Sequence, residues 1–240
     1  MKREALPIER PAVPTIAEGA YSRIRKDIIF GILPPGRRLK LEKLKKDYGA
    51  SVSTLREILN RLSSEMLVVA EGQRGFEVAP VSPENLREVA DLRLLLEGHA
   101  IEQSFAVGGV EWEGRVVAAH HKLAGLERLI SEGDNSKVEL WKRYDWEFHQ
   151  SLISACGSNV LIDTHASIFD QYLRYQLIAL SFRGEIAAAE HLALRDCALA
   201  KDAAKAREVL ARHILGGVEH ALDGGLKLRD GSPESILRES

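Results

Sequence analysis

The stretch GASVSTLREILNRL, residues 49–62, is the feature that most limits what this chain can fold into. Its apolar residues recur at positions i, i+3, i+4 and i+7, so a helix here buries one stripe of side chains. We expect Ser53 or Thr54 to cap its start, because Thr54 and Glu57 have the spacing of a capping box. The polar side chains expected on another side, where a partner could dock, are Arg56, Asn60 and Ser63. By itself, the stretch also fits an ordinary amphipathic helix.

The neighbouring segments predict a winged helix-turn-helix. Two shorter helices are expected before this one, at about residues 19–30 and 41–48. After it, residues 67–70 and 76–78 resemble two strands joined by a glycine-containing loop, which is a hairpin of wing size. In this arrangement the third helix enters the major groove of DNA. Arg74 would then lie at the wing tip, within reach of a phosphate or the minor groove.

The charge of the chain is unevenly distributed. Residues 1–80 hold 15 Lys and Arg against 10 Asp and Glu, whereas residues 81–240 hold 18 against 25. A basic first third on an acidic remainder favours a nucleic-acid-binding domain joined to a regulatory domain. Lys45, Lys46 and Arg74 are expected to contact DNA phosphates.

Cysteine content and hydropathy exclude several other classes. Cys156 and Cys197 are the only cysteines and lack CxxC spacing, which argues against a disulfide framework and against a thiolate zinc site. No run of eighteen uncharged apolar residues occurs, and no secretory signal pattern is present. We therefore expect a cytoplasmic protein with no membrane partner.

Residues 18–80 resemble the DNA-binding domain of the GntR family of bacterial transcription regulators. The resemblance rests on IIFGILPPGRRLKLEKL, then GASVSTLREILNRLSSEMLV, then QRGFEV, in that order. It implies operator contacts from residues before and within the third helix and from the wing, here Ser51, Ser53, Thr54, Arg56 and Gly75. Val52 departs from the pattern, because family members often have a guanine-reading Arg there. Val52 either reduces base readout or meets a thymine methyl group.

The rest of the chain predicts an all-α antiparallel helical bundle, so the fold class expected is mainly α. Ser82 is expected to cap its first helix. Helices are expected at about residues 83–105, 109–131, 137–155, 159–183, 185–200 and 202–222. The expected segments are a flexible arm at 1–17, a winged helix-turn-helix at 18–80, a linker at 81–84, the helical domain at 85–223 and a polar tail at 224–240.

Four polar side chains in the bundle have the spacing of a metal site. Asp145 and His149 are four residues apart in DWEFHQSL, so they project from one face of one helix. His191 and His213 lie on the last two helices, which could each add an imidazole. One carboxylate and three imidazoles suit zinc first, with nickel or manganese as alternatives. The other reading is that these are core or surface histidines, as a chain with eight histidines also allows.

Residues 85–222 resemble the all-helical effector domain of the FadR subfamily, called the FCD domain. The motifs that carry the resemblance are LRLLLEGHA, DWEFHQSLISACGSN, EHLAL and ARHIL. In metal-binding members the ligands fall at positions that correspond to Asp145, His149, His191 and His213. The resemblance also implies that Arg93 faces the effector cavity, although its position equally allows a surface Arg.

These observations favour a homodimeric, ligand-responsive transcription regulator, and a repressor in particular. It would bind a pseudo-palindromic double-stranded operator, a divalent metal and a small organic acid whose carboxylate joins the metal. The alternative is a metal-dependent hydrolase or oxygenase with a DNA-binding appendage, since such a site can activate water. Against an enzyme, the sequence lacks HExxH, GxSxG and glycine-rich phosphate-loop motifs and places no clear general base. A structural nucleoid protein is disfavoured by the acidic C-terminal half.

Overall fold

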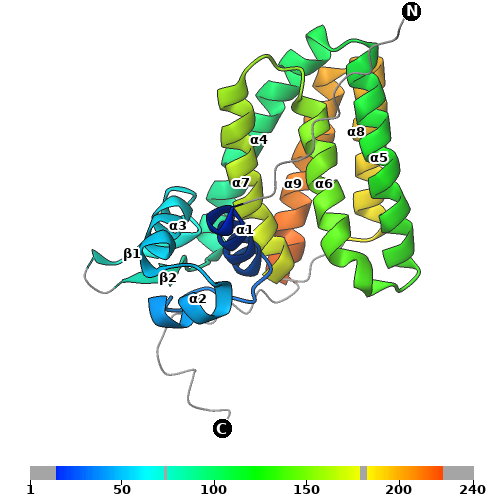
Figure 1. Ribbon diagram of the computed structural model, residues 1–240. Coiled ribbons are helices and arrows are strands. Elements are labelled where there is room, and N and C mark those ends of the chain that lie inside the picture. The colour runs from blue at the N-terminus through cyan, green and yellow to red at the C-terminus, as the bar shows by residue number, and fades with distance from the viewer. Residues whose placement is uncertain (1–14, 73–74, 179–182, 224–240) are drawn as a thin grey trace, which may run out of the picture.

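The computed structural model of the chain describes residues 15–72, 75–178 and 183–223 and shows two parts (Figure 1). Within these ranges, the N-terminal part has three helices and a two-stranded hairpin, and the C-terminal part is a bundle of six long helices. We call these parts the head and the effector domain. The predicted fold class, a winged helix-turn-helix followed by an all-α antiparallel bundle, is confirmed.

The head is built from short elements around one apolar core. Leu55, Leu59 and Leu62 form the buried stripe of its third helix, as the spacing predicted. The hairpin strands pair antiparallel with Val68 opposite Val78. The elements are α1 (Ile16–Ile29), α2 (Leu41–Tyr48), α3 (Val52–Ser64), β1 (Val68–Ala70) and β2 (Phe76–Val78).

The start of α3 differs from the prediction. Ser51 is the N-cap, and its side chain accepts a hydrogen bond from the backbone N–H of Thr54 at 3.1 Å. Ser53 and Thr54 therefore lie inside the helix, and the expected cap at one of them is wrong. The reason is the tight turn: Gly49 ends α2 in the left-handed conformation at φ 70°, so the chain reverses early enough for Ser51 to reach the helix start.

Two other predicted boundaries shift. Thr15 and Glu18 form a capping box, so α1 begins at Ile16, and residues 15–17 do not belong to a flexible arm. The remainder of the predicted arm and the predicted tail lie outside the described residues. Ser82 caps α4 as expected, but α4 begins at Pro83, so the predicted linker loses its last two residues to the helix.

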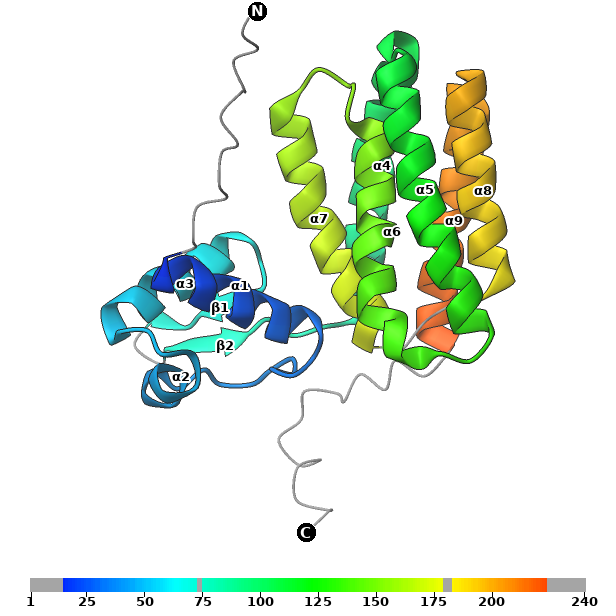
Figure 2. The same cartoon turned by 45° about the vertical axis from the view of Figure 1, so that its right-hand side comes forward.

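The effector domain is an up-and-down bundle in which successive helices run in opposite directions (Figure 2). Helix α7 lies on the side facing the head, and α8 and α9 lie on the far side. Its elements are α4 (Pro83–Val107), α5 (Val110–Ser131), the short 3-10 helix η2 (Asn135–Lys137), α6 (Val138–Ile153), α7 (Asn159–Ile178), α8 (Glu185–Ala200) and α9 (Ala203–Asp223).

Helix α7 belongs to both parts of the molecule. Its residues Phe169, Leu173 and Leu177 are buried in the core of the head. Tyr172 and Tyr175, on the same helix, are buried in the core of the effector domain. Each buried apolar side chain contributes on the order of 2 kcal/mol by leaving water. The head is therefore packed against the effector domain rather than only tethered to it.

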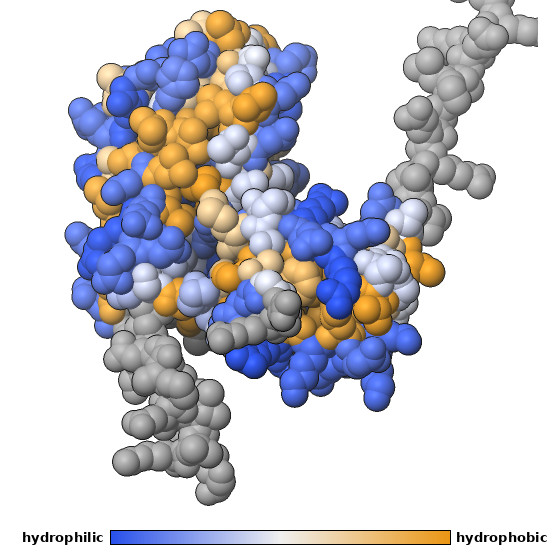
Figure 3. All heavy atoms as spheres, turned by 90° about the vertical axis from the view of Figure 1, so that its left-hand side faces the viewer, coloured by the Kyte–Doolittle hydropathy of each residue, from blue (hydrophilic) through white to orange (hydrophobic). Residues whose placement is uncertain are grey.

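The surface of the effector domain carries apolar side chains on the face shown in Figure 3. Leu95 of α4 is 68% exposed and Leu92 is 39% exposed, and neither belongs to a core cluster. Among the described helices, none is both long enough and apolar enough to cross a membrane.

Candidate metal centre

The four predicted ligands converge inside the effector domain. Asp145 and His149 come from α6, His191 from α8 and His213 from α9. Their ligand atoms all lie within 4.8 Å of one another, and all four side chains are buried. Within the described ranges, no other group of three or more His, Cys, Asp or Glu has this arrangement. The structure thus brings together the set that the sequence singled out.

The helices place these side chains for simple geometric reasons. Asp145 and His149 are one turn apart on α6, so they lie on the same face. The turn at Lys201 connects α8 to α9 as an antiparallel pair, and His191 and His213 lie at similar distances from it. Their ring centroids are consequently 4.6 Å apart.

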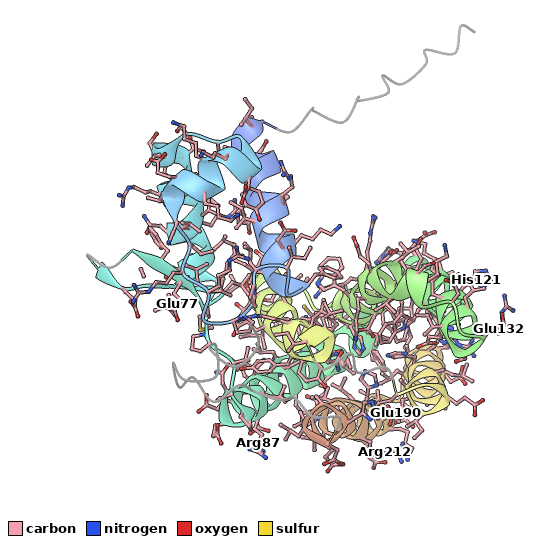
Figure 4. All side chains as sticks on the ribbon, turned by 90° about the horizontal axis from the view of Figure 1, so that it is seen from below. Glu77, Arg87, His121, Glu132, Glu190 and Arg212 are labelled. Atoms are coloured by element: carbon pink, nitrogen blue, oxygen red, sulfur yellow. The ribbon has the colours of Figure 1, made fainter. Side chains whose placement is uncertain are left out.

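Each of the three imidazoles is oriented by a glutamate on its Nδ1 side. The pairs are His149 with Glu97 of α4, His191 with Glu127 of α5 at 2.6 Å, and His213 with Glu190 of α8 at 3.0 Å. Figure 4 shows Glu190 where α8 meets α9. A carboxylate that accepts from Nδ1–H fixes the ring and leaves a lone pair on Nε2. This arrangement is typical of histidines that bind a metal.

The Nε2 atoms support the same conclusion. His149 Nε2 and His191 Nε2 are buried and have no hydrogen-bond partner. They lie 3.7 Å and 3.2 Å from Asp145 Oδ1. Two ligands on neighbouring positions of one ion, each at roughly 2.1 Å, are about 3 Å apart. The residues therefore fit a divalent ion, and coordination would satisfy two otherwise unpaired buried nitrogens.

Burial and charge separate the pKa values of the ligands. Burial would lower the pKa of His191, but contacts with Asp145 and Glu127 raise it to about 9. Burial and the neighbouring His191 lower the pKa of His213 to about 3. Burial opposes ionisation of Asp145, but contacts with His191 and Lys142 hold its pKa below its usual range. At neutral pH the metal-free cluster therefore has an ionised carboxylate, on Asp145, and one positively charged imidazole, on His191.

A cavity of about 10 Å³ opens beside the cluster. Lys142, Gln176 and Arg183 line it together with Asp145, His191 and His213. Lys142 and Arg183 are its two cations, although Arg183 also pairs with Glu190 at 2.6 Å and Asp145 adds a carboxylate to the same lining. Its volume is close to that of a single water molecule, so a larger ligand extends beyond it.

The structure places Arg93 in the interior and not on the surface. Its guanidinium Nε pairs with Glu97 at 2.9 Å, and its Nη2 lies 3.2 Å from His149 Nδ1. The guanidinium also stacks on Phe169, 4.2 Å from the ring centroid. Arg93 is not among the described residues that line the 10 Å³ cavity. Its predicted contact with an effector stays a prediction.

The predicted DNA contacts at the start of α3 and along it are exposed, except Thr54, which is half-buried. Ser51, Ser53 and Thr54 form a hydroxyl cluster at the start of α3, with Ser51 Oγ 2.8 Å from Ser53 Oγ and 2.9 Å from Thr54 Oγ1. Arg56 and Asn60 are exposed on α3. The free backbone N–H groups of a helix start and these hydroxyls suit a phosphate.

The other predicted DNA contacts are more scattered. Lys45 and Lys46 are exposed in the last turn of α2. Gly75 follows the wing loop with φ 95°, a conformation that favours glycine. Arg74 lies outside the described residues. Val52 is half-buried in the first turn of α3.

Sequence reasoning missed the groups that surround the ligands. Glu97, Glu127 and Glu190 were not singled out, nor were Lys142 and Arg183. A signal existed for some of them, because Glu97 lies one helical turn from Arg93 and Lys142 lies three residues before Asp145, which places each near a residue that was singled out. Which histidine each glutamate meets depends on how the helices pack, and no sequence spacing expresses that.

The metal-dependent enzyme and the regulator can be separated by comparison with known proteins. Residues 16–78 match the family described as bacterial regulatory proteins, gntR family, and residues 88–216 match the FCD domain. The chain is 37% identical over 225 residues to the HTH-type transcriptional regulator BphR of Paraburkholderia xenovorans (strain LB400), covering 93% of this chain and 92% of that protein. It is 32% identical over 203 residues to the HTH-type transcriptional repressor GlaR of Escherichia coli (strain K12), covering 81% and 90%.

Solved structures show the same fold. McbR/YncC of E. coli superposes with a TM-score of 0.72 at 18% identity, covering 88% of this chain and 99% of that one. A GntR regulator from Rhodococcus sp. RHA1 gives 0.70 at 21% identity, covering 86% and 97%. None of these relatives supports the enzyme alternative. The chain belongs to the GntR family of bacterial transcription regulators and has an FCD effector domain behind its winged helix-turn-helix.

Proposed function

We propose that the chain is a homodimeric repressor whose operator affinity is set by a small organic acid bound beside a divalent metal. Asp145, His149, His191 and His213 would hold the ion. The observation that carries the proposal is that three glutamates from three helices orient three imidazoles toward one point. Zinc is the first expectation for this donor set, with nickel and manganese as alternatives.

When bound, the ion would supply positive charge and open coordination positions for a carboxylate oxygen. Lys142 and Arg183 border the cavity beside the ligands and would attract the same anion. Arg93 remains a proposed contact on the His149 side of the cluster, provided that Glu97 releases it. A neutral metabolite of the same shape would gain none of this Coulomb attraction.

The metal cluster is connected to the head through α7. Phe169 contacts the ring of His149 and is also part of the core of the head. On the same helix, Asp170 pairs with Arg25 of α1, and Gln171 donates to the backbone oxygen of Glu65 at 3.4 Å. A ligand that shifts α6 against α7 would therefore move the head as well. Operator affinity changes by the difference in ligand affinity between the two positions.

A second copy of the chain is expected on the DNA. One short recognition helix reads few base pairs, and a two-fold dimer on a pseudo-palindromic, double-stranded operator doubles the contacts. Leu92 and Leu95 provide exposed apolar area on α4 that such a partner copy could cover. We expect the protein to act in the cytoplasm, because a DNA-binding role requires access to the operator.

The test uses the full chain, stripped of metal and then titrated separately with zinc, nickel and manganese. Operator binding is then measured with short dicarboxylates and hydroxy acids, and with neutral sugars as the comparison. We expect only the metal-loaded protein to respond, and only to acids. An equal response to neutral sugars, or an unchanged response after metal removal, rules out carboxylate sensing at the metal.

Replacing His213 with Ala provides the site-specific test. It should lower metal content and the melting temperature of the metal-loaded protein together, because binding to the folded state alone stabilises it. His99 of α4 is exposed and distant in sequence from the ligands, so His99→Ala is the matched control. If both variants retain the metal content of the parent, the ligand assignment is wrong.

A further inference from the structure

A second, much larger cavity lies between the head and the effector domain. It is a groove of about 760 Å³ bordered by α1 of the head and by η2, α6 and α7 of the effector domain. Figures 1 and 2 show α1 beside the lower half of α7. We call it the interdomain groove; its lining includes Tyr21, Arg25, Phe30, Lys142, Trp146 and Leu173. Its volume is that of an ordinary small-molecule pocket.

The groove has an excess of positive charge. Five of its lining residues are cations, whereas Glu139 and Asp170 are its only carboxylates among the described residues. Both carboxylates are already used, because Lys26 pairs with Glu139 and Arg25 pairs with Asp170. Three cations remain without a carboxylate inside the groove: Lys137, Lys142 and Arg143. An anion would gain Coulomb attraction from them.

The groove is also lined by large apolar groups. Phe30 projects from the end of α1, Trp146 from α6 and Leu173 from α7. Two aromatic rings and an aliphatic side chain form a surface for a flat apolar body. Charge and ring surface together suit a ligand with one acidic end and one apolar end.

Lys142 connects this groove to the metal cluster. It lines both the interdomain groove and the 10 Å³ cavity beside His191 and His213. The residue is only 3% exposed, yet no carboxylate of the described residues lies within 4.0 Å of its ammonium group. The ammonium is bonded instead to Gln176 Oε1 at 2.5 Å. Asp145 stabilises the ammonium from beyond 4.0 Å, and a ligand carboxylate in direct contact would add a closer counter-ion.

The sizes of the two cavities complement each other. The small cavity has room for about one water molecule, which is enough for a carboxylate oxygen but not for the remainder of an acid. The interdomain groove, which Lys142 also lines, has the room that the small cavity lacks. A longer ligand can therefore place its charged end at Lys142 and its body against Phe30 and Trp146.

We propose that the interdomain groove binds the apolar body of an arylalkanoic or similarly bulky carboxylate, whose acidic end pairs with Lys142 next to the metal cluster. This inference rests on the proposed acid sensing and specifies the ligand class. Because α1 forms one wall of the groove, such a ligand touches the head as well as the effector domain. Ligand binding then changes the position of the head directly.

The experiment uses the zinc-loaded full chain and isothermal titration with 4-phenylbutyrate. 4-Phenylbutanol keeps the ring but lacks the carboxylate charge, and butyrate keeps the carboxylate but lacks the ring. A charge-assisted hydrogen bond changes affinity by a factor of about ten or more, so 4-phenylbutyrate should bind at least that much tighter than the alcohol. It should also bind at least about tenfold tighter than butyrate, because the ring leaves water. Binding should change tryptophan fluorescence, and the signal should be lost in Trp146→Phe.

Two variants locate the ligand. Lys142→Met removes the buried ammonium at similar length, and Arg143→Gln removes an exposed charge from the groove lining. Each should weaken 4-phenylbutyrate binding severalfold. Arg115→Gln, an exposed charge on α5 away from the groove, is the matched control and should bind as the parent does.

The outcomes separate this inference from the proposed function. If succinate changes operator affinity while 4-phenylbutyrate binds no tighter than butyrate, the groove inference is wrong and metal-linked acid sensing stands. If neither acid acts, both fail. If 4-phenylbutyrate binds equally to the parent, Lys142→Met and Arg143→Gln, the ligand lies elsewhere and the inference is overturned.

Discussion

Phe169 lies against His149, with 5.5 Å between the ring centroids, although Phe169 belongs to the core of the head and His149 to the candidate metal centre. The contact joins the two parts of the molecule through one side chain of α7. The same ring supports the guanidinium of Arg93. A shift of His149 on metal or acid binding would therefore reach the DNA-binding head through the packed side chain of Phe169.

Phe169→Leu should uncouple the two parts while leaving the metal centre intact. The smaller side chain costs on the order of 1 kcal/mol of stability and removes the ring contact with His149. We expect metal affinity within about threefold of the parent, but a smaller change in operator affinity when the acid is added. Phe105→Leu, in the core near the end of α4, is the control. An unchanged acid response in Phe169→Leu would remove this contact from the coupling.

Glu127→Gln should weaken metal binding although Glu127 is not a ligand. It removes the carboxylate that accepts from His191 Nδ1–H at 2.6 Å. Loss of such a partner costs about 10- to 100-fold in metal affinity. Glu132→Gln, at the exposed end of α5 (Figure 4), should leave affinity unchanged. Equal affinities in a competition titration against a chelating dye would show that Glu127 has no orienting role.

Metal binding should release about one proton per ion at pH 7, because a histidine must be neutral to coordinate. Among the three predicted ligand histidines, only His191 has its pKa raised, to about 9, whereas burial lowers the pKa values of His149 and His213. Calorimetry in buffers of different ionisation enthalpy measures the proton count. A count of zero would mean that His191 is already neutral without metal.

The same pKa shift predicts how the stability of the metal-free protein varies with pH. The folded-state pKa of His191 lies above its usual value of about 6.5, so the protonated ring stabilises the folded state. This contribution is fully present below about pH 6.5 and is lost as pH rises to about 9. Urea unfolding of metal-free protein across this range should show declining stability, and His191→Gln should remove the decline.

Arg56→Ala should cost on the order of 1–3 kcal/mol of operator binding if the exposed guanidinium reads a base. Binding to random DNA should then change much less. Equal losses on operator and random DNA would make Arg56 a phosphate contact. Lys46→Gln provides the comparison, because loss of one phosphate contact should lower the slope of log affinity against log salt by about one unit.

The local features of this chain were determined by its sequence. The 3.6-residue period of Leu55, Leu59 and Leu62 specified α3, and Pro83 with Ser82 specified the start of α4. Asp145 and His149 could be paired because a helix places residues four apart on one face. These are short-range relations, which backbone geometry fixes before any tertiary contact forms. The N-cap of α3 was predicted wrongly because Ser51, Ser53 and Thr54 all have capping side chains, and only the turn at Gly49 decides between them.

Long-range relations were decided by the tertiary structure. Glu97 and His149 are 52 residues apart, and Glu127 and His191 are 64 apart, so no period in the sequence pairs them. The burial of Phe169 in the head, and the position of Lys142 between two cavities, depend on how α7 packs against α1 and α6. Helix packing depends on the complementary shapes of two whole helix surfaces. The sequence of one helix therefore does not specify which surface of another helix it packs against.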